Sequence, residues 1–193
     1  DATFEDILDV ASEAEVMVSH TASRSLHEIP RNVSDEQMRE IAARDGVVGL
    51  FPMPMFLGAD LDCSLGRFVD HVEHAVSVVG AEHVGLGGDF ISRLLVCPGL
   101  GVERIPPWLG IDNDQMALVV EGLDGPQGYP VLAAELQRRG LADDDVAGIM
   151  GGNFMRVLER ALRRRSNTPP DPGDPGRALA GSAPETRDDR SEP

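Results

Sequence analysis

Helix-like and strand-like hydrophobic patterns alternate along the first 90 residues of the chain. Apolar residues spaced three or four positions apart predict helices at residues 3–11, 34–44 and 65–79. Short continuous apolar runs predict buried strands at residues 16–18, 46–51 and 84–88. Buried strands without polar alternation, each separated by a helix, are typical of a parallel sheet covered by helices. The pattern therefore predicts an α/β fold.

Boundary signals support these elements. Ser34 and Gln37 form the Ser-x-x-Gln pattern of a capping box at the start of the second helix. Gly80 ends the third helix, and Pro52 and Pro54 stop the second strand.

The second half of the chain has a different composition. Residues 91–128 are rich in Pro and Gly and predict a long loop with one short helix near residues 116–121. Helical spacing returns in three segments, at residues 131–139, 143–150 and 154–165. From residue 166 onward almost no large apolar residue remains, which predicts a disordered acidic tail. We expect one folded unit over residues 1–165 and a tail over residues 166–193.

Charge and composition exclude several classes of partner. The formal net charge of -16 would repel nucleic acid and anionic membrane surfaces, and no apolar run is long enough to span a bilayer. Cys63 and Cys97 lack metal-type spacing and are expected to be unpaired thiols in a reducing compartment. We expect a cytoplasmic location, although a targeting segment upstream of Asp1 stays open because the chain does not begin with Met.

Three residues whose side chains could take part in catalysis or binding lie at or after the ends of predicted strands. His20 ends the first strand, Arg31 follows in the next loop, and Asp89 ends the glycine-rich third strand. In a β/α barrel these strand ends open on one face, where the active site lies. His20 could be a metal ligand or a core histidine, and Arg31 could bind a carboxylate or form a surface ion pair. Asp89 could accept a proton from metal-bound water or cap the next segment.

Other polar patterns favour structural roles. His71 and His74 have the spacing of a helical metal pair, but they lie within the apolar stripe of a covering helix. The acidic triplet at residues 143–145 begins a predicted helix, where negative charge is favourable. Neither it nor the Asp-Asn-Asp at residues 112–114 has the remaining ligands of a calcium loop.

Five separated motifs resemble, in order, the C-terminal half of the renal-type membrane dipeptidases. They are VSH at 18–20 with PRNVSD at 30–35, VGLGGDF at 84–90, GLD at 122–124, YP at 129–130, and GNFMRVL at 152–158. The resemblance runs from residue 1 to about residue 163. The opening DATF is similar to the stretch that follows a metal-binding histidine of that family.

This resemblance implies a fold and a reaction. The fold would be the C-terminal portion of a (β/α)8 TIM barrel of the amidohydrolase type, with about three parallel strands and their helices. The activity would be zinc-dependent hydrolysis of dipeptides, with two zinc ions in the complete enzyme. By motif, His20 corresponds to a ligand of the second zinc, Arg31 to the residue that binds the dipeptide carboxylate, and Asp89 to the carboxylate beside the attacking water.

Other features keep alternatives open. The remaining metal ligands would lie upstream of Asp1, so the fragment alone is expected to be inactive. Ile91 stands where the family often has a second aspartate, and FPMPM at 51–55 replaces a segment that often contains Asn and Tyr. A different amidohydrolase-type metal hydrolase and a non-catalytic remnant are the alternatives. The expected partner is a dipeptide substrate, and a homodimer stays open.

Overall fold

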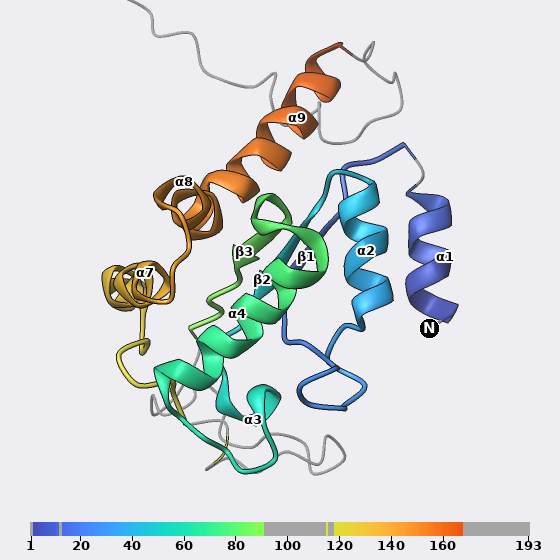
Figure 1. Ribbon diagram of the computed structural model, residues 1–193. Coiled ribbons are helices and arrows are strands. Elements are labelled where there is room, and N and C mark those ends of the chain that lie inside the picture. Colours follow the sequence, from blue (N-terminus) through green and yellow to red (C-terminus); the bar gives the residue numbers. More distant parts are fainter. Residues whose placement is uncertain (1, 12, 91–114, 116–117, 168–193) are drawn as a thin grey trace, which may run out of the picture.

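Three parallel strands form the centre of the fold. The computed structural model describes residues 2–11, 13–90, 115 and 118–167. The strands are β1 (Met17–Thr21), β2 (Val47–Leu50) and β3 (Val84–Leu86), in the spatial order β1-β2-β3. Both pairings are parallel (Figure 1), which confirms the predicted α/β organisation.

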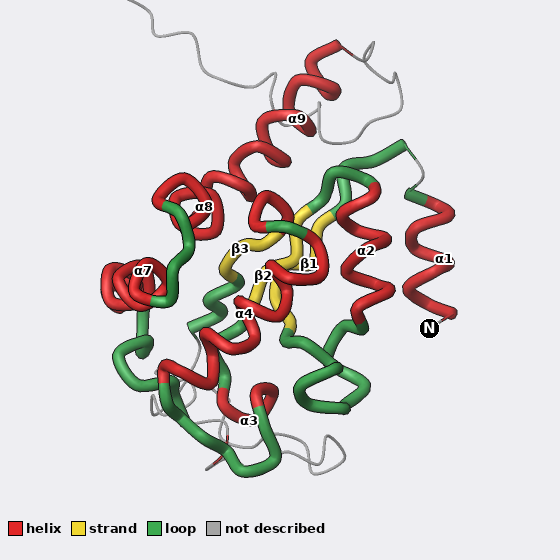
Figure 2. Tube along the Cα trace, in the orientation of Figure 1, coloured by secondary structure: helices red, strands yellow, loops and turns green. Residues whose placement is uncertain are grey.

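Helices surround this sheet. They are α1 (Ala2–Val10), α2 (Asp35–Ala43), α3 (Pro54–Leu57), α4 (Leu65–Val79), α7 (Tyr129–Arg138), α8 (Asp143–Ala147) and α9 (Asn153–Asn167). Two 3-10 turns, η1 (Ala81–His83) and η3 (Pro126–Gly128), and a π-helical turn, η4 (Gly148–Gly152), connect some of them. Figure 2 shows α4 lying across the short sheet, with α2 and α1 on one side and α7 and α8 on the other.

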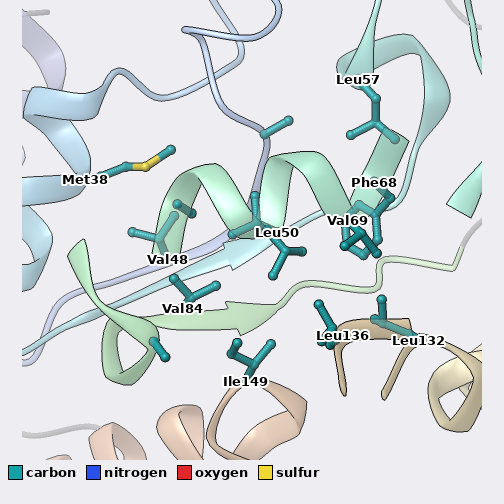
Figure 3. Packing of buried hydrophobic residues seen from close by; sticks show 14 of the residues in the cluster. Met38, Val48, Leu50, Leu57, Phe68, Val69, Val84, Leu132, Leu136 and Ile149 are labelled. Carbon is teal, nitrogen blue, oxygen red and sulfur yellow. The ribbon is translucent and has the colours of Figure 1, made fainter. Parts of the chain in front are cut away.

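The hydrophobic core fills the space between the sheet and the helices α2 and α4. Alternate residues of the strands, among them Val48, Leu50 and Val84, point into this layer and are fully buried. Met38 of α2 and Phe68 of α4 cover them (Figure 3). The same core continues to α7 and to η4 through Leu132, Leu136 and Ile149. Burial of these side chains is the main favourable term that holds helices and sheet together.

The other face of the sheet carries glycines and is covered by one aromatic ring. Gly49 and Gly85 are register partners on β2 and β3. The Phe154 ring lies so close that an added Cβ would be 2.9 Å from it at Gly49 and 2.6 Å at Gly85. The two glycines therefore provide the space in which Phe154, at the start of α9, packs against the sheet.

Arginines attach α9 to the opposite end of the strands from the candidate site. Arg156 and Arg160 both contact Asp45, in the turn just before β2. Arg160 and Arg164 also pair with Glu15, whose side chain is only 7% exposed, at 2.5 and 2.8 Å. Low exposure reduces solvent screening, so the pairs with Glu15 are expected to contribute more than ordinary surface ion pairs.

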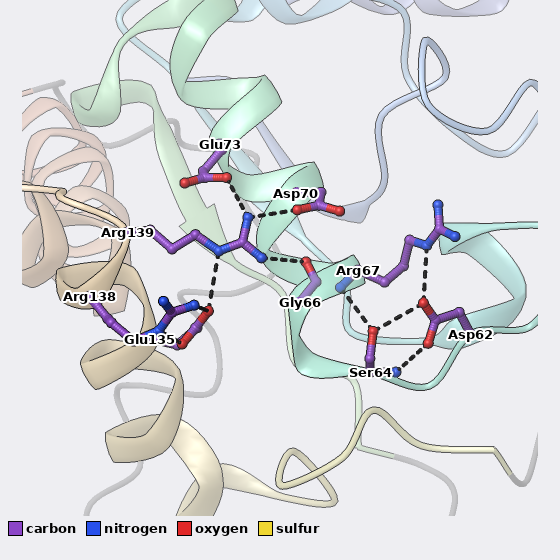
Figure 4. A network of polar contacts seen from close by, with 9 residues as sticks. All are labelled: Asp62, Ser64, Gly66, Arg67, Asp70, Glu73, Glu135, Arg138 and Arg139. Carbon is purple, nitrogen blue, oxygen red and sulfur yellow. Dashed lines mark hydrogen bonds and ion pairs between the residues drawn. The ribbon is translucent and has the colours of Figure 1, made fainter.

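A second ionic cluster joins α4 to α7. Arg139 contacts Asp70 at 2.7 Å and Glu73 at 2.8 Å on α4, and it also contacts Glu135 at 3.2 Å on its own side (Figure 4). Arg138 pairs with Glu135 at 2.6 Å. Charged hydrogen bonds from Arg138, and then from Arg139, lower the pKa of Glu135 to about 2.

The described elements agree closely with the helices and strands that the sequence predicts. The capping box of Ser34 and Gln37 is present, and α4 ends at Gly80 as expected. The prediction of a helix near residues 116–121 is wrong for residues 118–121, which are not helical. The one-turn helix α3 and the π-helical turn η4 were not predicted, and the tail lies outside the described residues from residue 168 on.

Removal of the Phe154 ring is expected to destabilise the fold. Because the ring is half-buried, we expect Phe154→Ala to lower the free energy of unfolding by about 3 kcal/mol, the low end of the range for such truncations. Met155→Ala is the control, because Met155 is 54% exposed and should change stability by only about 0.5 kcal/mol or less. Urea unfolding monitored by circular dichroism measures both. Equal effects would mean that Phe154 does not support the sheet.

The Glu135 pKa predicts a pH-dependent contribution to stability. Its folded pKa of about 2 lies below the ordinary value of 4.5, so the stabilisation is complete above pH 4.5 and is lost as the pH falls through about 2. We therefore expect Glu135→Gln to be less stable than the unsubstituted chain at pH 6, with a difference that closes between pH 4.5 and 2. Urea midpoints across this range test it, with Glu159→Gln, at an exposed pair with Arg163, as the control. A difference independent of pH would contradict the assignment.

Candidate functional site

The structure brings the three predicted site residues together. His20 lies near the end of β1, and its Nε2 is 3.7 Å from Oδ2 of Asp89, which follows β3. Arg31 donates from Nη1 to the main-chain oxygen of His20 at 3.1 Å. The side chains of His20 and Asp89 are 33% and 38% exposed. The sequence prediction of a shared location is confirmed, while the roles of the three residues stay predictions.

A β-bulge aims His20. In the pairing of β1 with β2, Val18 is opposite Val48 but Thr21 is opposite Leu50, so β1 has one extra residue between these points. Without it, His20 would point to the helix-covered face, as Val18 does, because strand residues alternate. A bulge redirects side chains. Here the His20 ring lies edge-on to Phe51, with 5.3 Å between the ring centroids.

Gly87, the residue after β3, allows the chain to pass close to the β1 backbone at this point. A Cβ added at Gly87 would lie 2.1 Å from the Ser19 carbonyl oxygen and 2.6 Å from Cβ of His20. Only glycine avoids this overlap, which confirms the expectation of close backbone approach in the glycine-rich strand. Two residues later, Asp89 has a positive φ of 37°, a region that aspartate enters more often than most residues. Gly87 and Asp89 together bring a carboxylate to the His20 ring.

The His20–Asp89 separation leaves room between the two groups. A distance of 3.7 Å is longer than a direct hydrogen bond, so the two side chains are not hydrogen-bonded to each other. Ser19 Oγ lies 2.9 Å from Nδ1 of His20, on the other side of the ring. Nε2 of His20 and the Asp89 carboxylate are thus both available to one water molecule or ion between them.

A closed loop returns Arg31 to the end of β1. Ser23 pairs with Val33 in an isolated parallel bridge, and Arg24 N donates to the Val33 oxygen at 2.8 Å. Thr21, which is buried, accepts from Val33 N at 3.2 Å and lies 3.4 Å from the Arg31 oxygen. These bonds fix both ends of the segment that carries Arg31.

Aromatic rings lie beside the site, a role that no sequence pattern predicted. The Arg31 guanidinium lies over the Phe56 ring, 5.6 Å from its centroid, a cation–π arrangement. The Phe56 and Phe51 rings are 5.4 Å apart, so the two phenylalanines connect Arg31 to His20. Phe56 belongs to α3, which was not predicted. Its position beside Arg31 depends on how two loops fold.

The two helical histidines are used by the fold. His71 is fully buried, and its ring nitrogens contact Ser23 N and the Leu57 oxygen, both at 3.0 Å. His74 contacts Asp35 at 2.8 Å. These partners support the structural interpretation over a metal pair. The contacts of His71 place it beside the loops that leave the C-terminal ends of β1 and β2.

The described residues do not by themselves form a metal site. Within them, no group of three or more His, Cys, Asp or Glu side chains is arranged to bind a metal ion. His20 and Asp89 have suitable nitrogen and oxygen donors, but a catalytic zinc site needs about three protein ligands.

Within the described part of the chain, the remaining candidates add no donor. Residues 112–114 and Cys97 lie outside the described residues, and the acidic triplet at 143–145 begins α8 as predicted. Cys63 is a free thiol whose pKa is raised by burial. Among the helices of the described ranges, none is both long and apolar enough to cross a membrane.

Sequence comparisons link the chain to dipeptidases. It matches the family model of membrane dipeptidases, peptidase family M19, over residues 1–109 and 100–170. Dipeptidase aclJ of Aspergillus oryzae is 32% identical over 81% of the chain and 33% of its own length. Dipeptidase 3 of Rattus norvegicus is 28% identical over 82% of the chain and 28% of its own length. The chain thus spans about a third of these relatives.

Solved structures share the fold. The probable dipeptidase PvdM from Pseudomonas aeruginosa matches 83% of the chain and 48% of its own length, with a TM-score of 0.65 and 22% identity. A metallopeptidase from Rhodobacter sphaeroides, liganded with a phosphinate mimic of the dipeptide L-Ala-D-Ala, matches 82% of the chain and 39% of its own length. Its TM-score is 0.62 at 23% identity. At these identities the likeness concerns the fold.

Proposed function

The chain belongs to the membrane dipeptidase family, peptidase family M19, and we propose that it forms part of a zinc-dependent dipeptidase. The observation that carries the proposal is the meeting of His20, Arg31 and Asp89 at the C-terminal ends of the strands. A metal-type nitrogen, a carboxylate and a guanidinium are what hydrolysis of a short peptide with a free carboxyl end requires.

We propose that the sheet is the last part of a (β/α)8 barrel, roughly its sixth to eighth strands. β1 and β3 are the edge strands of the three-stranded sheet. The helix-covered face would be the outside of the barrel, and the face with Gly49 and Gly85 the inside. The C-terminal strand ends, which carry His20 and Asp89, would then lie at the catalytic face.

Each residue has one proposed role. His20 would bind metal through Nε2, since its Nδ1 already faces Ser19 Oγ. Bound zinc would lower the pKa of a coordinated water toward neutrality and polarise the peptide carbonyl. Asp89 would hold the proton released on attack and pass it to the leaving amine. Arg31 would bind the carboxylate of the dipeptide with N–H groups that are not used on the His20 oxygen.

The remaining ligands are proposed to come from polypeptide outside this chain. His20 and Asp89 alone are too few for the site, and the match covers only 33% of the length of Dipeptidase aclJ. Another amidohydrolase-type hydrolysis is a second candidate. A solved amidohydrolase from Pseudomonas aeruginosa matches the chain at 26% identity with a TM-score of 0.62, which supports this second candidate function.

The purified chain alone is expected to bind zinc weakly and to be inactive. We would incubate residues 1–193 with zinc, remove excess metal, and measure metal content and hydrolysis of Gly–D-Ala. The expected result is well below one zinc per chain and no turnover, because about three protein ligands are needed. Stoichiometric tight zinc with turnover would show that the described donors and the rest of this chain suffice.

Arg31→Lys tests the substrate role in an active polypeptide that contains this segment. Lysine keeps the charge but loses the planar fork of donors. Loss of a charged hydrogen bond of about 1.5–3 kcal/mol predicts a fall in kcat/KM of roughly 10- to 150-fold for a free-acid dipeptide. Dipeptides with an amidated C-terminus should already be poor substrates and should be nearly insensitive to the change.

Arg67→Lys is the matched control. Arg67, in the first turn of α4, forms an ion pair at 2.8 Å with Asp60, which precedes the helix. The substitution should alter neither substrate preference nor kcat/KM by more than about twofold, since such pairs contribute at most about 1 kcal/mol to stability. Equal losses on free-acid and amidated dipeptides in Arg31→Lys would remove Arg31 from the substrate site.

A further inference from the structure

A buried histidine joins the two loops that carry Arg31 and Phe56. His71 of α4 has no exposed surface. Its Nδ1 lies 3.0 Å from the main-chain nitrogen of Ser23, at the start of the Arg31 loop. Its Nε2 lies 3.0 Å from the main-chain oxygen of Leu57, the last residue of α3.

The partners of the ring define its chemical form. The Ser23 main-chain N–H can only donate, so Nδ1 of His71 accepts. In the neutral ring the proton is therefore on Nε2, which donates to the Leu57 carbonyl. Burial lowers the pKa of His71, which favours this neutral form. One neutral imidazole thus serves as acceptor to one loop and donor to the other.

Asn32 adds a second link beside the first. Its side chain is 1% exposed, and Nδ2 donates to the Phe56 oxygen and to the His27 oxygen, both at 2.9 Å. Side chains from two different elements thus bind the consecutive carbonyls of Phe56 and Leu57. Asn32 directly follows Arg31, so this link fixes the main chain next to the guanidinium.

We propose that His71 is a positioning residue that, with Asn32, holds the Phe56 ring beneath the Arg31 guanidinium and so orients Arg31 toward the site. The substrate carboxylate that Arg31 would meet rests on the proposed function, whereas the positioning itself does not. Arg31 has a long side chain, and its contacts here are the His20 oxygen and the Phe56 ring. Its direction therefore depends on where α3 and the Arg31 loop lie relative to each other.

Two conservative substitutions separate the halves of the His71 link. His71→Asn can keep an acceptor near Nδ1 but lacks the reach to Leu57, whereas His71→Gln can keep a donor near Nε2. Hydrogen exchange followed by mass spectrometry on the 193-residue chain reads each loop separately. We expect His71→Asn to speed exchange at residues 53–58 and His71→Gln at residues 22–33. The expected increase is roughly 3- to 10-fold, as for loss of one buried hydrogen bond.

His83 provides the matched control. Its Nδ1 contacts the Gly46 oxygen at 2.9 Å, which is a similar bond at the opposite end of the strands. His83→Gln should leave exchange at residues 22–33 and 53–58 unchanged. Exchange that rises evenly over the whole chain in the His71 variants, including complete unfolding, would assign His71 to the fold alone and overturn the proposal. Unchanged exchange in both loops would overturn it as well.

Activity gives an independent measurement in an active polypeptide that contains this segment. His71→Gln and His71→Asn should raise KM for a free-acid dipeptide several-fold while kcat falls less, because the binding group is displaced and the reacting groups are not. His83→Gln should leave KM unchanged. A fall in kcat with unchanged KM would overturn the positioning role. If no dipeptide is hydrolysed, the proposed function fails, but the exchange measurements still decide the role of His71.

Discussion

The candidate site depends on main-chain hydrogen bonds that continue beyond the strands. Phe51 N donates to the Thr21 oxygen and Gly87 N to the Leu50 oxygen, both at 2.8 Å. The parallel ladder thus extends to Thr21, next to His20, and to Gly87, two residues before Asp89. Main-chain groups buried in a core must be paired, so these bonds are strongly specified. His20 thus lies near the end of a strand held by the ladder and Asp89 lies shortly after one, whereas Arg31 lies in a loop that is closed by its own hydrogen bonds.

The two faces of the sheet serve this frame in different ways. One face is covered by α2 and α4 in a continuous apolar core, which supplies most of the stabilisation. The other face has little side-chain volume at Gly49, Gly85 and Gly87. At Gly49 and Gly85 this leaves room for the Phe154 ring, and at Gly87 it lets the chain pass close to the β1 backbone. Arginine clusters then fasten the peripheral helices α7 and α9. The packing thus involves the faces of the sheet, whereas the candidate site lies at the C-terminal ends of the strands.

Sequence patterns were sufficient for the three strands, for most of the helices and for the positions of His20 and Asp89 at or after strand ends, because these depend on local spacing. The α4 stripe and its Gly80 end are of this kind, and so are His20 and Asp89 at strand ends. The bulge at His20 was not predictable, since one extra residue in a strand leaves the apolar run unchanged. The links of His71 were also hidden, because Ser23 and Leu57 lie 48 and 14 residues away in sequence.

The partners of Arg31 differ from those of the arginines that fasten the helices. The chain has 33 acidic and 17 basic residues, so carboxylates are abundant, and arginines such as Arg139 and Arg160 each contact more than one. None of the carboxylates in the described ranges pairs with Arg31, whose contacts are a carbonyl oxygen and an aromatic ring. A guanidinium has five N–H donors, and because Arg31 is exposed, those not directed at His20 are available to water or to a ligand. Under the proposed function, a substrate carboxylate would replace that water beside His20 and Asp89.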